Sequence, residues 1–144
     1  MGKAEEAISY LNQGANCAQS ILSAFSEELG IDKDLALRIA SGFGGGMCQG
    51  EVCGAVTGAI LVLNLKYGNS KMGDSGNKEK IYHLIRSFSD EFRNRNGSIN
   101  CSDLLGIDLQ KEANRAVARE KGLFKDNCSR YVEAAVKIIE NLDQ

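Results

Sequence analysis

Proline is absent from this chain of 144 residues, and apolar residues recur at helical spacing along most of its length. Proline interrupts helices, so its absence leaves that spacing unbroken. Glycine divides the pattern instead, for example at Gly14 and Gly30, and glycine is the residue that most often follows the end of a helix. Strand-like alternation is weak. The sequence therefore predicts an all-α, single-domain fold over residues 1–144, a helical bundle of about five to six helices with no sheet.

The apolar periodicity also predicts where the helices lie. We expect the main helices over residues 3–12, 17–29, 51–67, 77–95 and 128–142. A further main helix follows Asp32 as its N-cap, and its inner face is expected to hold five residues: Leu35, Ala36, Ile39, Ala40 and Phe43. A short helix over residues 101–106 and a polar helical segment over 108–121 add to these.

Glycine is concentrated in the segment from Gly42 to Gly50, which is too rich in glycine to continue a helix. The segment lacks the G-x-x-x-x-G-K-[ST] pattern and follows a helix rather than a strand, which argues against a nucleotide-binding loop. We expect a tight turn that passes close to the helix ends carrying cysteine. In the next helix Gly54 and Gly58 share one face, where a neighbouring backbone is expected to come close.

The formal net charge is −2, with 17 basic and 19 acidic residues. This balance argues against binding to nucleic acid, which requires a basic face. No apolar run approaches the ~20 residues that span a bilayer, and no secretory leader is visible, so we expect no membrane contact and a cytoplasmic location. His83 falls opposite the apolar stripe of its helix, and the charged run from Arg115 to Lys121 is typical of a solvated helix face.

Five cysteines are the main chemical feature of the chain. An odd number fits a secreted disulfide framework poorly, and a reducing cytosol keeps most pairs open. Three interpretations follow: small hydrophobic residues in the core, ligands of a metal or cluster, or redox-active thiols. No C-x-x-C pair is present, so the spacing indicates neither a thioredoxin-type site nor a zinc ribbon.

Three of the cysteines share one local context, because each follows an asparagine at the expected start of a helix: Asn16-Cys17, Asn100-Cys101 and Asn127-Cys128. Asparagine is a favoured N-cap, and Gln19 and Asp103 stand where the second partner of a capping box belongs. Cys53 also lies in the first turn of its expected helix. Unpaired N–H groups and the macrodipole stabilise a thiolate at a helix N-terminus, so we predict lowered thiol pKa values.

The same argument predicts that four cysteines converge on one site: Cys17, Cys53, Cys101 and Cys128. Helices that return the chain to the same end of a bundle bring such distant residues together. Cys48 is expected at the edge of this site. Backbone at four glycines is expected to approach the sulfur atoms and any cofactor bound there: Gly44, Gly45, Gly46 and Gly54.

The segment Cys53-Gly54-Ala55-Val56-Thr57-Gly58 resembles the signature of the C_GCAxxG_C_C family of bacteria and archaea, which is named for the spacing of its cysteines and described as redox-active. The resemblance extends from Asn16-Cys17-Ala18-Gln19 through the glycine-rich segment to the two last cysteines. It implies that the four family cysteines correspond to Cys17, Cys53, Cys101 and Cys128, and that Cys48 lies outside this set. It also implies genes near transporters and oxidoreductases, but no established reaction.

Two functions from different classes fit these cysteines. The preferred one is a redox-active protein whose thiols pass electrons by thiol–disulfide exchange, within the site or with a redox partner protein or an oxidoreductase. The alternative is a binding module in which Cys17, Cys53, Cys101 and Cys128 hold an iron–sulfur cluster or a zinc ion. A purely structural interaction domain remains if every cysteine is inert. The spacing of the cysteines does not decide between these functions.

Overall fold

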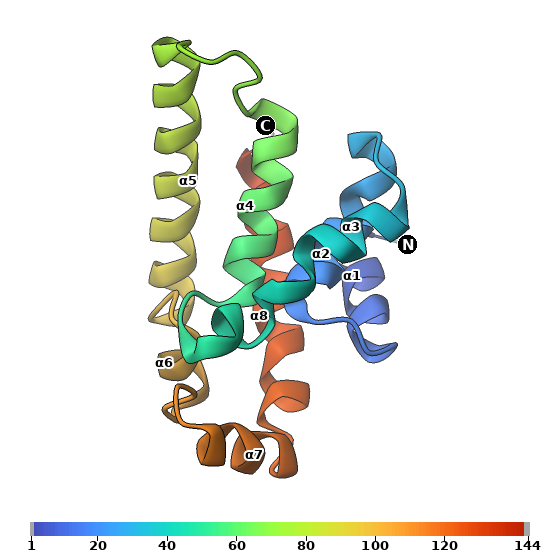
Figure 1. Ribbon diagram of the computed structural model, residues 1–144, viewed down its shortest axis with the longest axis vertical. Coiled ribbons are helices and arrows are strands. Elements are labelled where there is room, and N and C mark those ends of the chain that lie inside the picture. The colour runs from blue at the N-terminus through green and yellow to red at the C-terminus, as the bar shows by residue number, and fades with distance from the viewer. Residues whose placement is uncertain (1, 143–144) are drawn as a thin grey trace.

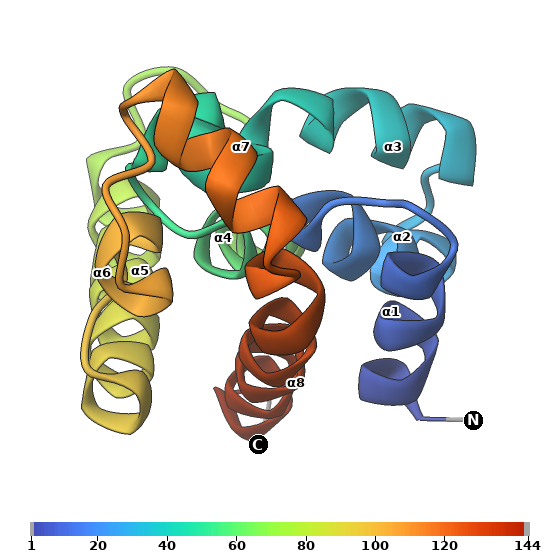
Figure 2. The ribbon, with the colours of Figure 1, turned by 90° about the horizontal axis from the view of Figure 1, so that it is seen from below.

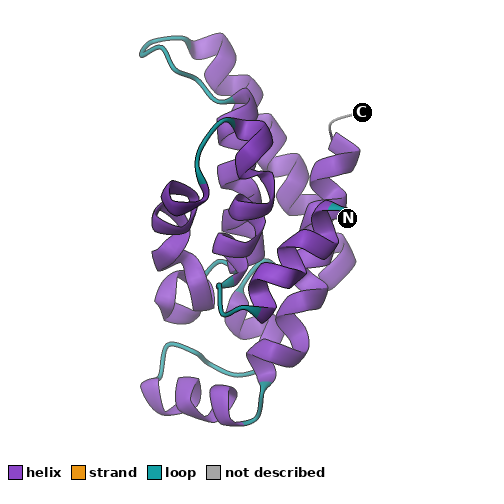
Figure 3. Ribbon diagram, turned by 90° about the vertical axis from the view of Figure 1, so that its right-hand side faces the viewer, coloured by secondary structure: helices purple, strands orange, loops and turns teal. Residues whose placement is uncertain are grey.

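The computed structural model describes residues 2–142, and over that range it contains helices and connecting segments but no strand (Figure 1, Figure 3). The α-helices are α1 (Lys3–Asn12), α2 (Cys17–Leu29), α3 (Lys33–Ala40), α4 (Gly54–Tyr67), α5 (Ser75–Asn96), α6 (Cys101–Leu105), α7 (Glu112–Glu120) and α8 (Leu123–Leu142). The predicted all-α class is confirmed for the described residues. The predicted number of about five to six helices is too low, because the short α6 and the polar α7 are complete helices.

Polar side chains cap the N-termini of several helices, as the sequence indicates. The Asn16 side chain accepts the Gln19 backbone N–H at 2.9 Å, and the Gln19 side chain accepts the Asn16 N–H at 3.0 Å, which completes a capping box on α2. Asp32 caps α3 and Asn100 caps α6 through one side-chain bond each. The predicted second partner of a capping box on α6 is wrong, because the Asn100 N–H donates to the Ser98 hydroxyl at 2.9 Å and Asp103 accepts from that hydroxyl. Gly30 follows α2 in the left-handed conformation, with φ 74°. The predicted starts of α2, α3 and α6 are therefore confirmed.

Helix α4 is mostly apolar and packs against α2, α5 and α8, while α2 also contacts α1 and α3 (Figure 1, Figure 2). The largest fully buried side chains of this core come from α2, α4, α5 and α8: Ile21, Leu22, Phe25, Leu63, Phe88, Phe92, Ile138 and Ile139. They belong to one apolar cluster. Because that cluster joins α2, α4 and α8, it fixes the positions of the three helix segments that carry or adjoin Cys17, Cys53 and Cys128.

Gly58 allows α4 to approach α2 closely. A Cβ atom built on Gly58 would stand 2.8 Å from the Ala18 Cα and 3.1 Å from the Ala18 carbonyl oxygen, which leaves no room for a side chain. A Cβ atom on Gly54 would stand 3.1 Å from the Cβ of Cys17. The predicted close helix contact is confirmed, and the neighbouring helix is α2.

Two helix starts differ from the prediction. Helix α4 begins at Gly54 rather than Glu51, because the residues before Gly54 pair with the segment that precedes α6. Helix α8 begins at Leu123 rather than Cys128, because the turn is made earlier, at Gly122, whose φ of 69° suits glycine. Cys128 consequently lies within a helix and not at its start.

The short helix α3 buries less of its apolar face than predicted. Ala36 and Ala40 are fully buried, whereas Leu35 and Ile39 stay 41% and 40% exposed. Alanine carries the smallest apolar side chain, so the alanine edge of α3 rests close on α2 and the two larger residues turn outward. Phe43 lies beyond the end of α3 and packs against the core while partly buried, so three of the five residues predicted for the inner face contribute to the core.

Two further predictions concern the exposure of His83 and the absence of a membrane-spanning segment. His83 is exposed on α5, as its place opposite the apolar stripe indicates. Within residues 2–142, none of the helices combines the length and the apolar composition that crossing a membrane requires.

Candidate functional site

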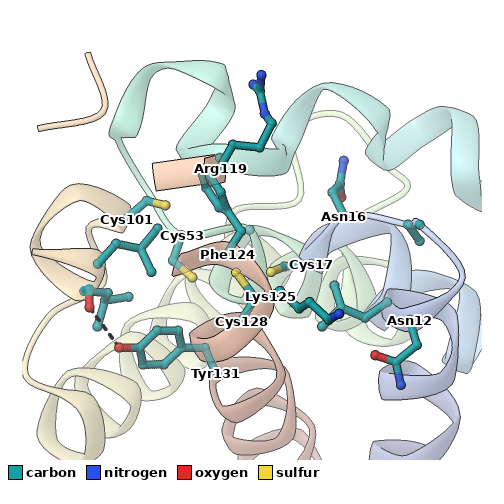
Figure 4. A pocket seen from close by; sticks show the side chains of 17 residues that line it. Asn12, Asn16, Cys17, Cys53, Cys101, Arg119, Phe124, Lys125, Cys128 and Tyr131 are labelled. Carbon is teal, nitrogen blue, oxygen red and sulfur yellow. Dashed lines mark hydrogen bonds between the residues drawn. The ribbon is translucent and has the colours of Figure 1, made fainter. Parts of the chain in front are cut away.

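A cavity of about 640 Å³ is lined by residues of α2, α4, α6 and α8 and by four cysteines: Cys17, Cys53, Cys101 and Cys128 (Figure 4). All four are free thiols and buried, with exposed fractions between 4% and 9%. Much of the remaining wall is apolar and includes Leu104, Phe124 and Tyr131. The structure thus brings together four thiols that lie far apart in the sequence.

Cys17 and Cys128 reach the cavity from two long helices. Cys17 is the first residue of α2, as predicted. Cys128 lies inside α8, so the predicted N-cap at Asn127 is wrong; the Asn127 side chain instead donates to a carbonyl oxygen of the preceding helical turn at 2.8 Å. Cys128 faces the cavity because it shares a helix face with Phe124 and Tyr131, which line it too.

Cys53 and Cys101 flank a short antiparallel bridge. The bridge pairs Val52 with Asn100, and each of these residues is followed by a cysteine. The cysteine N–H groups donate across the bridge, at 2.7 Å for Cys53 and 2.6 Å for Cys101. Side chains alternate along extended backbone, so both cysteines point to the same side of the bridge. Cys53 then caps α4 and Cys101 begins α6, which confirms their predicted places at helix starts.

Two of the four glycines expected at the site line the cavity, and the other two do not. Gly45 and Gly54 line the cavity, whereas Gly44 and Gly46 lie beside it. A Cβ atom built on Gly46 would stand 2.8 Å from the Cβ of Cys101, so the absence of a side chain at Gly46 allows the loop to pack against this cysteine. The glycine-rich segment therefore packs against a cysteine of the site, and of the four predicted glycines only Gly45 and Gly54 line the cavity itself.

Cys48 lies outside the cavity. Its thiol is exposed and donates to the Gly42 carbonyl oxygen at 3.6 Å. Met47 and Cys48 both have positive φ, 61° and 62°, which is uncommon for residues other than glycine. In this left-handed turn Cys48 stays at the surface, so it does not occupy the predicted place at the edge of the four-cysteine site.

Burial reverses the predicted acidity of Cys53 and Cys101. It raises the pKa of Cys53 to about 11 and the pKa of Cys101 to about 12. The N–H groups of Ala55 and Val56, at the start of α4, lower the pKa of Cys53 as predicted, but burial outweighs them. A helix N-terminus contributes about 0.3–1 kcal/mol, less than the ~1.4 kcal/mol that one pKa unit represents, whereas burial moves a thiol by several units. The predicted lowering is therefore wrong for both thiols.

Cys17 and Cys128 interact with each other in the cavity wall. Their interaction raises the pKa of Cys17 well above its ordinary value and lowers the pKa of Cys128. Burial and the neighbouring thiols raise the pKa of Cys17 further, so the predicted lowering is wrong for Cys17 as well. Figure 4 shows the two sulfur atoms next to each other. Cys128 is thus the most acidic thiol of the cavity, through its contact with Cys17 and not through a helix terminus.

The sequence reasoning missed two cations at the cavity, Arg119 and Lys125. They stand on either side of the turn at Gly122. Arg119 belongs to the charged run predicted as a solvated helix face, and Lys125 lies beyond that run. Both side chains are exposed, and neither has a hydrogen-bond or ion-pair partner among residues 2–142. Gly122 could have indicated their position. A turn at this glycine, followed by the apolar Phe124, predicts that the chain returns to the core here.

The residues present do not fit a metal in this arrangement. Over the described part of the chain, no group of three or more His, Cys, Asp or Glu side chains is placed to hold a metal ion. Ligands of one ion must surround a single point. Cys101 instead packs with Leu109 and Ala118 in a small cluster, separate from the main core that contains the other three cysteines. The geometry therefore gives no support to a zinc or iron–sulfur site.

The fold and the cavity define a small all-helical protein with four buried thiols at one site. The family model C_GCAxxG_C_C, described as a putative redox-active protein, matches residues 15–142. The match runs from the cap of α2 to the end of α8, so the chain belongs to this family, as its cysteines and glycines indicate. Neither a curated protein nor a solved structure matches the chain.

One detail of the signature differs in this chain. In the family's name the cysteine directly precedes A-x-x-G. Here Gly54 takes that position, and Cys53 stands one residue earlier, at the cap of α4. Because a Cβ atom on Gly54 would crowd Cys17, the glycine at this position keeps room for the cysteine of α2.

Proposed function

We propose that this protein performs thiol–disulfide exchange, with Cys17 and Cys128 as its redox pair. The observation that carries the proposal is the place of these two thiols in the wall of one cavity, where Figure 4 shows their sulfur atoms next to each other. A thiolate attacks a disulfide most effectively when its pKa lies near the ambient pH. Cys128 has the lowered pKa and is assigned the attacking role. Cys17 keeps its proton and is assigned the resolving role, in which it displaces the group bound to Cys128.

Cys53 and Cys101 are not assigned the first attack. With pKa values of about 11 and about 12, their thiols remain protonated near neutral pH. They share the cavity with the redox pair, so a disulfide formed at Cys17 and Cys128 has two further thiols nearby. We infer that they accept the disulfide in a later exchange step.

Mass mapping of disulfides tests the assigned pair. The fully reduced protein is exposed without oxygen to 2-hydroxyethyl disulfide, a neutral probe, and the remaining thiols are then alkylated before digestion. The expected main product is a Cys17–Cys128 cross-link. Cys128→Ser should form none, and Cys17→Ser should retain a probe molecule on Cys128. Cys48→Ser serves as the matched control, because Cys48 lies outside the cavity.

Two results would contradict this function. The first is a main cross-link between other cysteines, or no cross-link at all. The second is protein purified without oxygen that shows visible absorption from thiolate-bound iron, which would favour the binding-module alternative and require the cavity to rearrange around a cluster.

A further inference from the structure

The redox pair is open to a small molecule rather than to a protein surface. Cys17 and Cys128 are each 9% exposed and lie in the wall of the cavity of about 640 Å³. Cavities of about 300–1,000 Å³ hold small organic ligands. A disulfide in a folded protein is flanked by backbone on both sides, which hinders its approach to two thiols that are each only 9% exposed.

The charged groups at the cavity have one sign. Arg119 and Lys125 line it, and no Asp, Glu or His among residues 2–142 does, although the whole chain carries a net charge of −2. In Figure 4 the Lys125 side chain extends toward Asn12, and the Arg119 guanidinium is directed away from the sulfur atoms. The two cations therefore stand at the rim of the cavity, where they can meet a charged group that lies several bonds from the reacting sulfur.

The surface between the rim and the thiols is apolar. Leu104, Leu105 and Phe124 form part of it, and such a surface suits the carbon chain of a ligand. Helices α2 and α4 both start at this cavity, and the positive ends of their dipoles add to the field of the two cations. The two cations, the apolar side chains and the thiols thus all belong to one cavity.

We propose that the molecule that exchanges with Cys17 and Cys128 is a low-molecular-weight disulfide bearing carboxylate or phosphate groups, and that Arg119 and Lys125 bind those groups. The proposal rests on the redox function proposed above and adds the class of its substrate. It also explains why two cations that the described chain leaves without partners stand at a thiol cavity in an acidic protein.

The reaction consists of two exchanges. The Cys128 thiolate attacks one sulfur of the substrate RSSR, which forms a Cys128–SR disulfide and releases RS⁻. The Cys17 thiol passes its proton to the released RS⁻ and attacks the Cys128 sulfur, which forms the Cys17–Cys128 disulfide and releases a second RS⁻. The substrate gains two electrons and leaves as RSH and RS⁻, and the protein loses two electrons. The reverse sequence oxidises two molecules of the thiol.

Charge-neutral variants and a series of disulfides test the substrate class. Arg119→Gln combined with Lys125→Gln removes both rim cations. Lys111→Gln combined with Lys121→Gln is the matched control, since these exposed lysines stand at the ends of α7 and outside the cavity lining. The rate of Cys17–Cys128 formation is measured with four probes: oxidised glutathione, oxidised coenzyme A, neutral 2-hydroxyethyl disulfide and cationic cystamine.

The rim variant should react roughly tenfold more slowly than the unmodified protein with the anionic probes, and high salt should shrink this difference. Its rate should stay unchanged with the neutral probe and rise with cystamine. The control variant should follow the unmodified protein. A larger loss with oxidised coenzyme A identifies phosphate as the recognised group, and a larger loss with oxidised glutathione identifies carboxylate.

The substrate class is overturned if the rim variant slows all probes equally or none of them. It is also overturned if insulin, a protein disulfide, reacts faster than every small probe. In these cases the Cys17–Cys128 cross-link still forms, so the redox function stands. Failure to form that cross-link with any probe contradicts the redox function itself.

Discussion

The two cysteine pairs in the cavity are buried to similar extents but are held in different ways. Cys17 and Cys128 belong to long helices of the main core and interact with each other, which lowers the pKa of Cys128 and raises that of Cys17. Cys53 and Cys101 flank a bridge of extended backbone, and burial raises both of their pKa values. The comparison teaches that a neighbouring thiol makes a buried thiol acidic here, whereas a place at a helix start does not.

The largest expected effect is on stability in alkali, and it concerns the Cys53 and Cys101 pair. The folded pKa values of about 11 and about 12 lie above the ordinary value of 9.0, so the folded state keeps protons that the unfolded state releases. The stabilisation is complete below pH 9 and is lost as the pH rises through about 11 and about 12. The loss is on the order of 3–4 kcal/mol for each thiol.

Urea unfolding between pH 8 and pH 12 measures this loss. Cys53→Ala combined with Cys101→Ala should unfold with a flatter pH dependence above pH 9, whereas Cys48→Ala should keep the original slope. If the free energy of unfolding changed equally with pH in the unmodified protein and both variants, Cys53 and Cys101 would be less buried than described. The two cysteine pairs would then not differ in how burial affects their pKa values.

Gly58→Val should destabilise the fold by about 1–3 kcal/mol, because the new side chain would meet the Ala18 backbone of α2. Pushing α2 outward should also move Cys17 from Cys128 and leave the bridge between α4 and α6 intact. Thermal unfolding measures the first effect and disulfide mapping the second. Gly76→Val is the control, since the nearest atom to a Cβ there is the Asp74 carboxylate at 3.9 Å. Equal melting temperatures for both variants would refute the close contact.

Alkylation at pH 7 should modify Cys128 at least about tenfold faster than Cys53. The thiolate fraction of a thiol with pKa below 9.0 exceeds that of a thiol with pKa about 11 by more than ~100-fold. The lower intrinsic reactivity of the more acidic thiolate removes about tenfold of this advantage. Peptide mass analysis after short exposure to iodoacetamide gives both rates in one sample. Faster labelling of Cys53 would reverse the assignment of the two pairs.

The smallest effect should follow from the Cys17 thiol alone. Cys17→Ala removes the thiol that lowers the pKa of Cys128, so that pKa should rise and alkylation of Cys128 at pH 7 should slow by about threefold for each pKa unit. Cys17→Ser keeps an O–H donor and should retain most of the rate. The pH dependence of alkylation separates the two variants. Matching profiles would show that another group makes Cys128 acidic.

The sequence predicts local features of this molecule far better than the environment of its thiols. Asn16 and Asn100 cap their helices as expected, because each stands where the apolar pattern begins. Asn127 precedes a cysteine in the same way, but Phe124 already continues the apolar face of α8, and Gly122 marks the true turn. The pattern of Asn followed by Cys alone does not distinguish these cases.

The chemistry of the site depends on contacts that no local pattern contains. The contact between Cys17 and Cys128 joins the first and last thirds of the chain, and the bridge beside Cys53 and Cys101 joins two loops. These contacts and burial decide the thiol pKa values, so the sequence predicted that four cysteines meet at one cavity, with the wrong direction of pKa shift for Cys17, Cys53 and Cys101.

The separation of Cys17 and Cys128 along the chain, about 110 positions, couples oxidation to folding. Two thiols this far apart rarely meet in an unfolded chain, so the pair can be oxidised efficiently only after α2 and α8 have packed together. A bond between them would close a loop around most of the protein and restrict the unfolded chain, which corresponds to about 4–5 kcal/mol in the chain-entropy account. The oxidised protein would therefore melt at a higher temperature than the reduced protein, and reduction would act as a switch toward unfolding.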